Sequence, residues 1–135
     1  MNKSCSVEET VQLAKGLACQ LPQGGLVLLY GDLGVGKTVF VKGLVEGFKG
    51  SRESVNSPTF TIMQHYEGRL PITHVDLYRL SMREVEDLGL EEVIEESGVT
   101  VIEWADRIGE PYPEAVKVTI SDAGADQRTI DIRFP

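Results

Sequence analysis

The amino-acid sequence predicts an α/β domain in which helices flank a mixed parallel and antiparallel sheet. Short apolar segments, typical of strands that are buried on both faces, occur at residues 26–30 and 99–104. Segments with apolar residues at helical spacing lie before and after the first of these strands, so helices and strands alternate along the chain. The length of 135 residues suits a single domain, here predicted to span residues 1–135.

The N-terminal part is predicted to form a helix, a strand and a second helix. Ser6 followed by Glu9 is a capping-box pattern, and apolar residues then mark one helical face until the chain reaches Pro22. The strand at 26–30 comes next, after two glycines. Apolar residues then recur at helical spacing as far as Phe48, which predicts the second helix.

The remaining part is predicted to add strands in both orientations. Residues 49–58 are polar and turn-rich, which indicates a loop. The next two strands are separated by a connection that fits a hairpin better than a helical crossover, so the sheet should be mixed. The predicted elements are strands at 59–66 and 72–78, an acidic helix from the capping box Ser81–Glu84 to Gly89, a helix at 90–96, the strand at 99–104, and a hairpin of 116–120 with 129–134.

A phosphate-binding motif lies between the first buried strand and the second helix. Gly31, Gly36, Lys37 and Thr38 match the pattern G-x-x-x-x-G-K-[ST]. Glycines let the backbone amides approach phosphate oxygens closely, and the helix that follows directs its free N–H groups and positive dipole end toward the anion. Lys37 would reach the β- and γ-phosphates and Thr38 would bind Mg²⁺. This motif in this context predicts a three-layer P-loop NTPase domain.

Composition excludes several classes of protein. The formal net charge of −8 argues against a protein that binds nucleic acid on its own, because such proteins neutralise phosphates with a basic surface. The sequence contains no apolar stretch long enough for a membrane span and no signal-peptide pattern at its start, so we expect a cytoplasmic protein. The acidic helices are interpreted as a solvated surface, with a docking surface as the alternative.

Two carboxylates lie at or near the ends of predicted strands, where open α/β sheets place their ligands. Asp76 lies within the segment His-Val-Asp-Leu-Tyr-Arg at 74–79, and Glu103 ends the apolar segment 99–103. A carboxylate at such a position could assist a magnesium ion beside the phosphate loop. A single acid after a strand is also a common turn residue, so Glu103 alone leaves both interpretations open. His74 is interpreted as a half-buried strand residue making one hydrogen bond, and Trp104 is either beside the site or part of the core.

Thr59 occupies the position of a nucleotide sensor, after the loop that follows the phosphate-loop helix. A threonine there can sense the γ-phosphate and magnesium, although a hydroxyl that begins a strand after a proline is an equal alternative. Guanine-specific proteins are excluded, because no Asn-Lys-x-Asp occurs and Asp76 is not followed by x-x-Gly. A small-molecule kinase stays open, but the sequence shows no arginine-rich lid segment.

The sequence resembles the TsaE family, the small P-loop ATPase of bacterial tRNA threonylcarbamoyladenosine biosynthesis. The resemblance covers nearly the whole chain and depends on the order and spacing of four motifs. They are the phosphate loop at 31–38, Ser-Pro-Thr-Phe at 57–60, His-Val-Asp-Leu-Tyr-Arg at 74–79, and Ile-Glu-Trp at 102–104.

The resemblance implies an ATPase that needs partner proteins. Family members bind ATP and ADP with Mg²⁺ and hydrolyse ATP slowly, faster in complex with TsaD-type and TsaB-type proteins. Those partners attach the threonylcarbamoyl group to the adenosine beside the anticodon in tRNAs reading ANN codons. The ATPase does not form that bond, but its cycle supports turnover of the TsaB-TsaD complex. It would contact tRNA only indirectly, which is consistent with its negative charge.

The resemblance also assigns roles to individual residues. Thr38 and Glu103 would hold Mg²⁺, and Asp76 would position water or the metal. Tyr78 and Trp104 would lie beside the site and the partner. The full implied set is catalytic Lys37, Asp76 and Glu103, with Leu33, Gly34, Val35, Gly36, Lys37, Thr38, Thr59 and Arg128 at the nucleotide. Arg128 and the start of the N-terminal helix are the weaker candidates, for the adenosine side.

Two other functions remain as alternatives at this stage. A small-molecule P-loop phosphotransferase would consume ATP rapidly without a partner, given a suitable acceptor. A nucleotide-gated binding module would differ between its ATP and ADP forms in partner affinity, with hydrolysis incidental.

Overall fold

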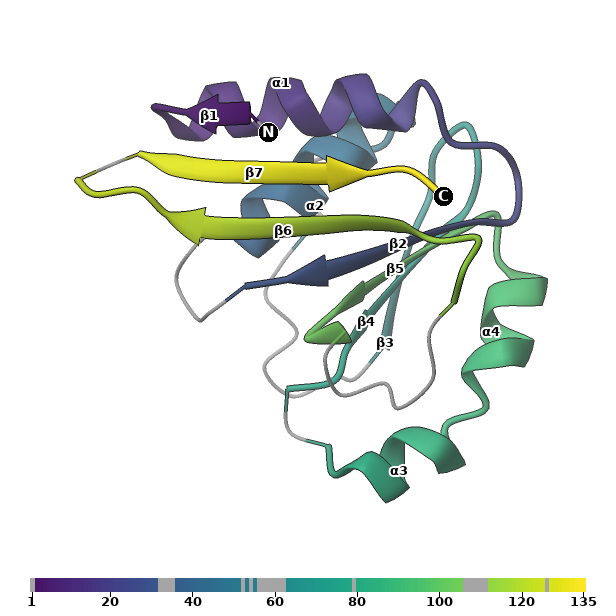
Figure 1. The fold of residues 1–135 in the computed structure, drawn as a ribbon. Helices are drawn as coiled ribbons and strands as arrows, with labels where there is room; N and C mark the ends of the chain where they lie inside the picture. The colour runs from purple at the N-terminus through teal and green to yellow at the C-terminus, as the bar shows by residue number, and fades with distance from the viewer. Residues whose placement is uncertain are drawn as a thin grey trace.

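The computed structural model describes residues 2–31, 36–51, 53, 55, 63–78, 80–105, 112–125 and 127–135. Within these residues the chain forms one seven-stranded sheet and four helices (Figure 1). The elements are β1 (Asn2–Ser4), α1 (Val7–Ala18), β2 (Gly25–Tyr30), α2 (Lys37–Gly47), β3 (Met63–Tyr66), β4 (Ile72–Asp76), α3 (Met82–Asp87), α4 (Leu90–Glu96), β5 (Val99–Glu103), β6 (Val116–Asp122) and β7 (Arg128–Arg133).

The sheet has parallel strands at its centre and antiparallel strands at both margins. Its order is β1-β7-β6-β2-β5-β4-β3. Strand β2 pairs in parallel with β5 and β6, and β4 pairs in parallel with β5. Strands β3, β7 and β1 are added antiparallel. The mixed sheet inferred from the short hairpin connections is therefore confirmed.

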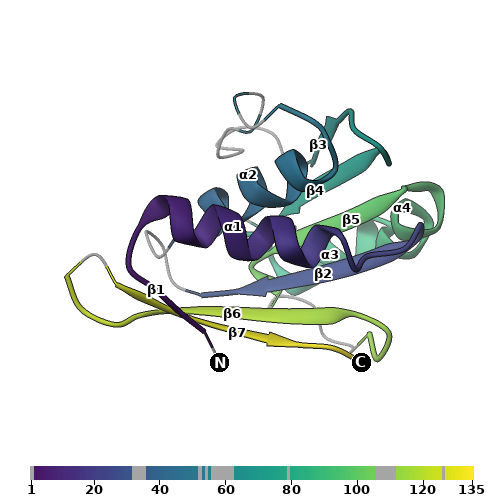
Figure 2. The same ribbon diagram turned by 90° about the horizontal axis from the view of Figure 1, so that it is seen from above.

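Helices cover both faces of the sheet and give three layers. Figures 1 and 2 show α1 and α2 on one face and α3 and α4 on the other. Two hydrophobic clusters lie between the layers. Val27 and Leu29 of β2 belong to the cluster under α1 and α2, whereas Leu26 and Leu28 belong to the opposite one. Alternate residues of a buried strand point to opposite faces, so this strand must be apolar throughout.

The α1 and α2 helices pack closely because glycines of α2 face alanines of α1. A Cβ atom added at Gly43 would lie 2.6 Å from Cβ of Ala14, and one at Gly47 would lie 2.5 Å from Cβ of Ala18. At such distances no side chain fits without a shift of the backbone. This pairing places α1 against α2, the helix that begins directly after the phosphate loop.

The structure corrects several details of the predicted elements. Strand β1 was not predicted, because three residues carry no periodicity. Strand β4 ends at Asp76 rather than at residue 78, while the predicted start of β3 lies outside the described residues. The capping box at Ser81 is complete, but at Ser6 only the cap forms, since the Glu9 carboxylate accepts the amide of Cys5 instead.

No helix in the described part of the chain is both long and apolar enough to cross a membrane.

Candidate functional site

The carboxyl ends of three parallel strands bring the candidate site residues together. Leu29 of β2 is aligned with Glu103 of β5, and Glu103 is aligned with Asp76 of β4. Because the three strands are parallel, their last residues meet at one edge of the sheet, where the phosphate loop leaves β2. The two carboxylates predicted as magnesium partners are thus neighbours, on adjacent strands.

The described ends of the phosphate loop have the geometry that glycine permits. Gly31 and Gly36 adopt φ values of 148° and 101°, which residues with a Cβ rarely adopt. Gly36 is the N-cap of α2 and has no side chain to occupy the first amides of the helix. Thr38 lies in the first turn of α2. The predicted ligands Leu33, Gly34 and Val35 fall outside the described residues, as does Thr59.

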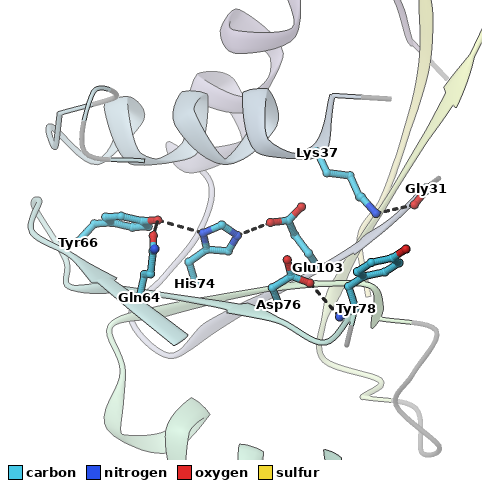
Figure 3. Close-up of polar contacts among 8 residues, drawn as sticks. All are labelled: Gly31, Lys37, Gln64, Tyr66, His74, Asp76, Tyr78 and Glu103. Atoms are coloured by element: carbon cyan, nitrogen blue, oxygen red, sulfur yellow. Dashed lines mark hydrogen bonds and ion pairs between the residues drawn. The ribbon is translucent and has the colours of Figure 1, made fainter. Parts of the chain in front are cut away.

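Lys37 is buried at the start of α2, with its ammonium group held between a backbone carbonyl and an aromatic ring. Only 5% of the residue is exposed. Its Nζ donates a hydrogen bond of 2.6 Å to the carbonyl of Gly31, as Figure 3 shows, and lies 3.3 Å from the centroid of the Trp104 ring. A buried ammonium group needs such partners, because desolvation otherwise disfavours its charged form. A fixed cation is therefore present at the phosphate loop.

Trp104 holds an unusual backbone conformation directly after Glu103. Its φ of 59° lies in the left-handed region, where bulky side chains are rare. Its ring contacts that of Tyr78, with centroids 4.7 Å apart. Residues with such backbone strain cluster at active and ligand-binding sites, although Lys49 and Ala125 also adopt positive φ elsewhere in this chain. The Trp104 ring therefore contacts both Lys37 and Tyr78, and it also packs against the apolar cluster that contains Leu26 and Leu28.

Asp76 lies next to Glu103 at the same edge of the sheet. Its Oδ1 accepts a hydrogen bond of 2.9 Å from the backbone amide of Tyr78. Burial raises the pKa of Asp76; this hydrogen bond lowers it, and the negative charge of Glu103 raises it further. The raised pKa means that the ionised form of Asp76 is less favourable here than in water, and a cation bound beside the carboxylate would offset that cost.

His74 connects the site to β3 and differs from its prediction. It is completely buried and has two polar contacts, where a half-buried residue with one was expected. Its Nε2 lies 2.5 Å from Oε2 of Glu103, and its Nδ1 lies 3.1 Å from the hydroxyl of Tyr66 (Figure 3). The Tyr66 hydroxyl in turn donates a 2.5 Å hydrogen bond to Oε1 of Gln64.

Tyr66 and Gln64 are the site residues that sequence reasoning missed. Burial, and then the charge of Glu103, raise the pKa of Tyr66 to about 12, so its hydroxyl stays protonated. The predicted hairpin contained a usable signal. Alternate residues of paired strands share a face, and Gln64 is directly opposite His74.

Arg128, the weakest nucleotide candidate, makes its described contacts elsewhere. Its Nη1 donates to the carbonyl of Gln127 at 2.8 Å and lies 3.5 Å from Asp122, so these contacts anchor it to the turn between β6 and β7. The start of α1 borders a hollow whose lining, among the described residues, is Lys3, Glu8, Glu9, Gln12 and Leu13, without Gly31 or Gly36 of the phosphate loop. A role of either region toward the adenosine stays a prediction.

The polar side chains at this edge suit a hard divalent cation such as Mg²⁺. Thr38, Asp76 and Glu103 offer only oxygen atoms, the ligands that Mg²⁺ prefers. In the described part of the chain, no group of three or more His, Cys, Asp or Glu side chains is arranged to hold a metal by itself. That combination fits an ion bound through one or two carboxylates together with nucleotide phosphates.

Comparison with known proteins identifies the family. Residues 4–130 match the family model described as threonylcarbamoyl adenosine biosynthesis protein TsaE. The chain belongs to the TsaE family. The predicted resemblance is thereby confirmed.

Individual relatives agree with this assignment over most of their length. The tRNA threonylcarbamoyladenosine biosynthesis protein TsaE of Bacillus subtilis is 45% identical over 130 residues, covering 95% of this chain and 81% of the relative. The protein of the same name from Treponema pallidum is 43% identical over 119 residues, covering 87% of each. The crystal structure of Bacillus subtilis YdiB is similar with a TM-score of 0.76 at 34% identity, covering 97% of this chain and 82% of that one.

Proposed function

We propose that this TsaE family member is a magnesium-dependent ATPase that supports threonylcarbamoyladenosine biosynthesis in tRNA. The names of its relatives support the pathway. One structural observation carries the ATPase part: a buried lysine at the phosphate loop lies at the sheet edge where the carboxylates of Asp76 and Glu103 meet. Phosphoryl transfer depends mainly on positioning and electrostatic stabilisation, and these groups can supply both.

Each group at this edge has a distinct task in the proposed reaction. Lys37 would exchange the Gly31 carbonyl for phosphate oxygens and neutralise their charge, and the first amides of α2 would add hydrogen bonds. Thr38 and Glu103 would hold Mg²⁺, and Asp76 would orient water or a metal-bound water. The ion would supply charge stabilisation on the β- and γ-phosphates. The alignment of Asp76 with Glu103 on adjacent strands keeps these groups together.

The proposal extends to partners. ATP hydrolysis by the isolated protein would be slow, and TsaD-type and TsaB-type proteins would accelerate it in the cytoplasm. Those proteins would hold the tRNA and modify the adenosine beside the anticodon, since this chain carries a net charge of −8. The ATPase cycle would support repeated turnover of that complex.

Titration calorimetry with Mg²⁺-ATP tests the nucleotide site. Lys37→Ala should lower the affinity at least about 100-fold, because it removes a buried cation that meets phosphate. Lys42→Ala, which changes another lysine of α2, is the matched control and should bind as the wild type does. An unaltered affinity of Lys37→Ala would exclude the proposed site.

Reconstitution tests the role in the pathway. With both partner proteins and unmodified tRNA, the chain should sustain several rounds of modification for each complex, and Glu103→Ala should stop after the first. Rapid ATP consumption by the isolated chain with a small-molecule acceptor would instead favour a phosphotransferase. Multiple turnover by a hydrolysis-deficient variant would favour a nucleotide-gated binding module.

A further inference from the structure

We propose that His74 is a positioning residue that fixes the Glu103 carboxylate for Mg²⁺, and that Tyr66 and Gln64 hold His74 in place. This inference rests on the proposed function, because it concerns the metal ligand of that site. The four residues come from three neighbouring strands and form one continuous line of polar contacts in Figure 3.

The contact between His74 and Glu103 determines which carboxylate oxygen is used. An ionised carboxylate only accepts hydrogen bonds, so Nε2 of His74 carries the proton and donates to Oε2 over 2.5 Å. With Oε2 engaged, Oε1 is the oxygen through which Glu103 would bind the ion. The imidazole thus fixes the rotation of the carboxylate, as hydrogen-bonded partners of metal ligands generally do.

The other side of the imidazole is also held. Nδ1 lies 3.1 Å from the hydroxyl of Tyr66, and this hydroxyl lies 2.5 Å from Oε1 of Gln64. With the proton on Nε2, Nδ1 is an acceptor, so the single hydroxyl hydrogen of Tyr66 is shared between Nδ1 and Gln64. Gln64 pairs directly with His74 across the β3–β4 hairpin, so the backbone register sets its distance from the ring. Since both ring nitrogens have partners, the imidazole can neither rotate nor flip without losing a hydrogen bond in a buried environment.

The burial of these groups argues for a functional rather than a stabilising role. His74 is 0% exposed, Glu103 is 4% exposed and Tyr66 is 7% exposed. Burying a polar pair of this kind costs desolvation that apolar side chains of similar size would avoid, so such pairs are weak sources of stability. Nearby, Ile72 of β4 and Val101 of β5 are buried apolar residues of the same helix-covered cluster, so the sheet packs well there without polar groups.

Binding of AMP-PNP, a non-hydrolysable ATP analogue, separates a positioning role from general damage when it is measured with Mg²⁺ and with EDTA. The ratio of the two affinities is the gain that Mg²⁺ provides. His74→Leu should reduce this gain about 10- to 100-fold and leave the affinity in EDTA unchanged. His74→Gln, which keeps an N–H donor, should recover most of the gain, and Tyr66→Phe should lose a smaller part. His65→Leu, at the only other histidine, is the matched control.

The outcomes distinguish this inference from the proposed function. If wild-type protein gains no affinity from Mg²⁺, the proposed site itself is wrong. If the wild type gains affinity and His74→Leu retains the full gain, or loses affinity equally with and without Mg²⁺, the positioning role is wrong. If His74→Leu does not fold, as judged by thermal unfolding, Tyr66→Phe decides the question, because it removes a single hydroxyl. A full gain in Tyr66→Phe would then overturn the proposal.

Discussion

On the face of the sheet covered by α1 and α2, strands β3, β4 and β5 present Tyr66, His74 and Glu103, joined by hydrogen bonds. On the face covered by α3 and α4, alternate residues of β4 and β5 are Val75 and Ile102, within an apolar cluster. Thr100 of β5 is also buried, and its hydroxyl has no hydrogen-bond partner among the described residues.

This difference indicates that one face of the sheet carries the groups of the proposed site, whereas the other face contributes mainly to the stability of the fold. Buried polar groups cost free energy unless they are paired, and those at the proposed site are paired with one another. The opposite face contributes mainly apolar burial, together with the Thr73 hydroxyl, which contacts Ser97, and the Thr100 hydroxyl, which has no partner in the described part of the chain; neither hydroxyl has a place in the proposed mechanism. Variants of the first face should therefore change nucleotide chemistry, whereas variants of the second should change only stability.

The largest expected effect is on hydrolysis. Glu103→Gln keeps the shape of the side chain but removes its charge, so single-turnover ATP hydrolysis should fall at least about 100-fold. Glu86→Gln on α3 is the matched control and should retain the wild-type rate. Equal hydrolysis rates for the wild type, Glu103→Gln and Glu86→Gln would mean that the face carrying Glu103 has no special role in ATP hydrolysis.

A large effect on stability is expected at Leu90, which is 5% exposed at the start of α4. Leu90→Ala should lower the free energy of unfolding by about 2–4 kcal/mol, through lost burial and a residual cavity. Urea denaturation measures this change. Nucleotide affinity, measured where the variant is folded, should stay within about twofold of wild type, because distant sites are nearly independent. A tenfold weaker affinity would contradict the separation of the faces.

The packing of α1 on α2 should be sensitive to a single methyl group. Gly43→Ala should lower stability by about 1–2 kcal/mol, because the new Cβ would lie 2.6 Å from both Cβ of Ala14 and the carbonyl of Val11. Gly16→Ala adds the same group on α1, where nothing lies within 4 Å, and should raise stability by about 0.5–1 kcal/mol. Thermal unfolding of both variants tests this prediction. It would be wrong if the unfolding temperatures of Gly43→Ala and Gly16→Ala shifted in the same direction.

Thr100→Val should stabilise the protein by about 1 kcal/mol. The substitution preserves shape and removes a buried hydroxyl that lacks a described partner. Urea unfolding would reveal the gain. Destabilisation would show that the hydroxyl has a partner after all, such as a bound water.

The smallest effect concerns pH. Burial raises the pKa of Asp76, so its ionised form is disfavoured in the folded state, and stability falls as the pH rises through this pKa. Asp76→Asn should therefore raise the unfolding temperature at about pH 7, and the advantage should shrink as the pH falls toward about 4. Thermal scans across this range measure it. An advantage that grew toward acid pH would show that the pKa is lowered instead.

Much of the fold could be predicted because strong patterns determined it. The wholly apolar β2 and the phosphate motif indicated a parallel centre, and the short connection after β3 indicated a mixed sheet. Strand β1 could not be predicted, because it pairs with β7 from the far end of the chain and has three residues. Local sequence does not encode such long-range pairing.

The candidate site also contains residues that could be predicted from the sequence and contacts that could not. Lys37, Asp76 and Glu103 follow from a motif and from acids at strand ends, and the structure brings them to one edge of the sheet. The contact between His74 and Glu103 could not be predicted, because it depends on the register between β4 and β5, whereas the β3–β4 hairpin held a signal for Tyr66 and Gln64. The left-handed backbone of Trp104 has no sequence signal either.

The site forms only if β4 and β5 pair in the register that aligns Asp76 with Glu103, so its formation reports on correct folding of the sheet. A shift of β4 by one residue would exchange the two faces of the strand, moving His74 and Asp76 away from α2. Such a misfolded sheet would keep much of its secondary structure but lose the site. Under the proposed function, the recovery of Mg²⁺-dependent nucleotide binding during refolding would therefore measure the fraction of molecules in native register, which circular dichroism cannot do.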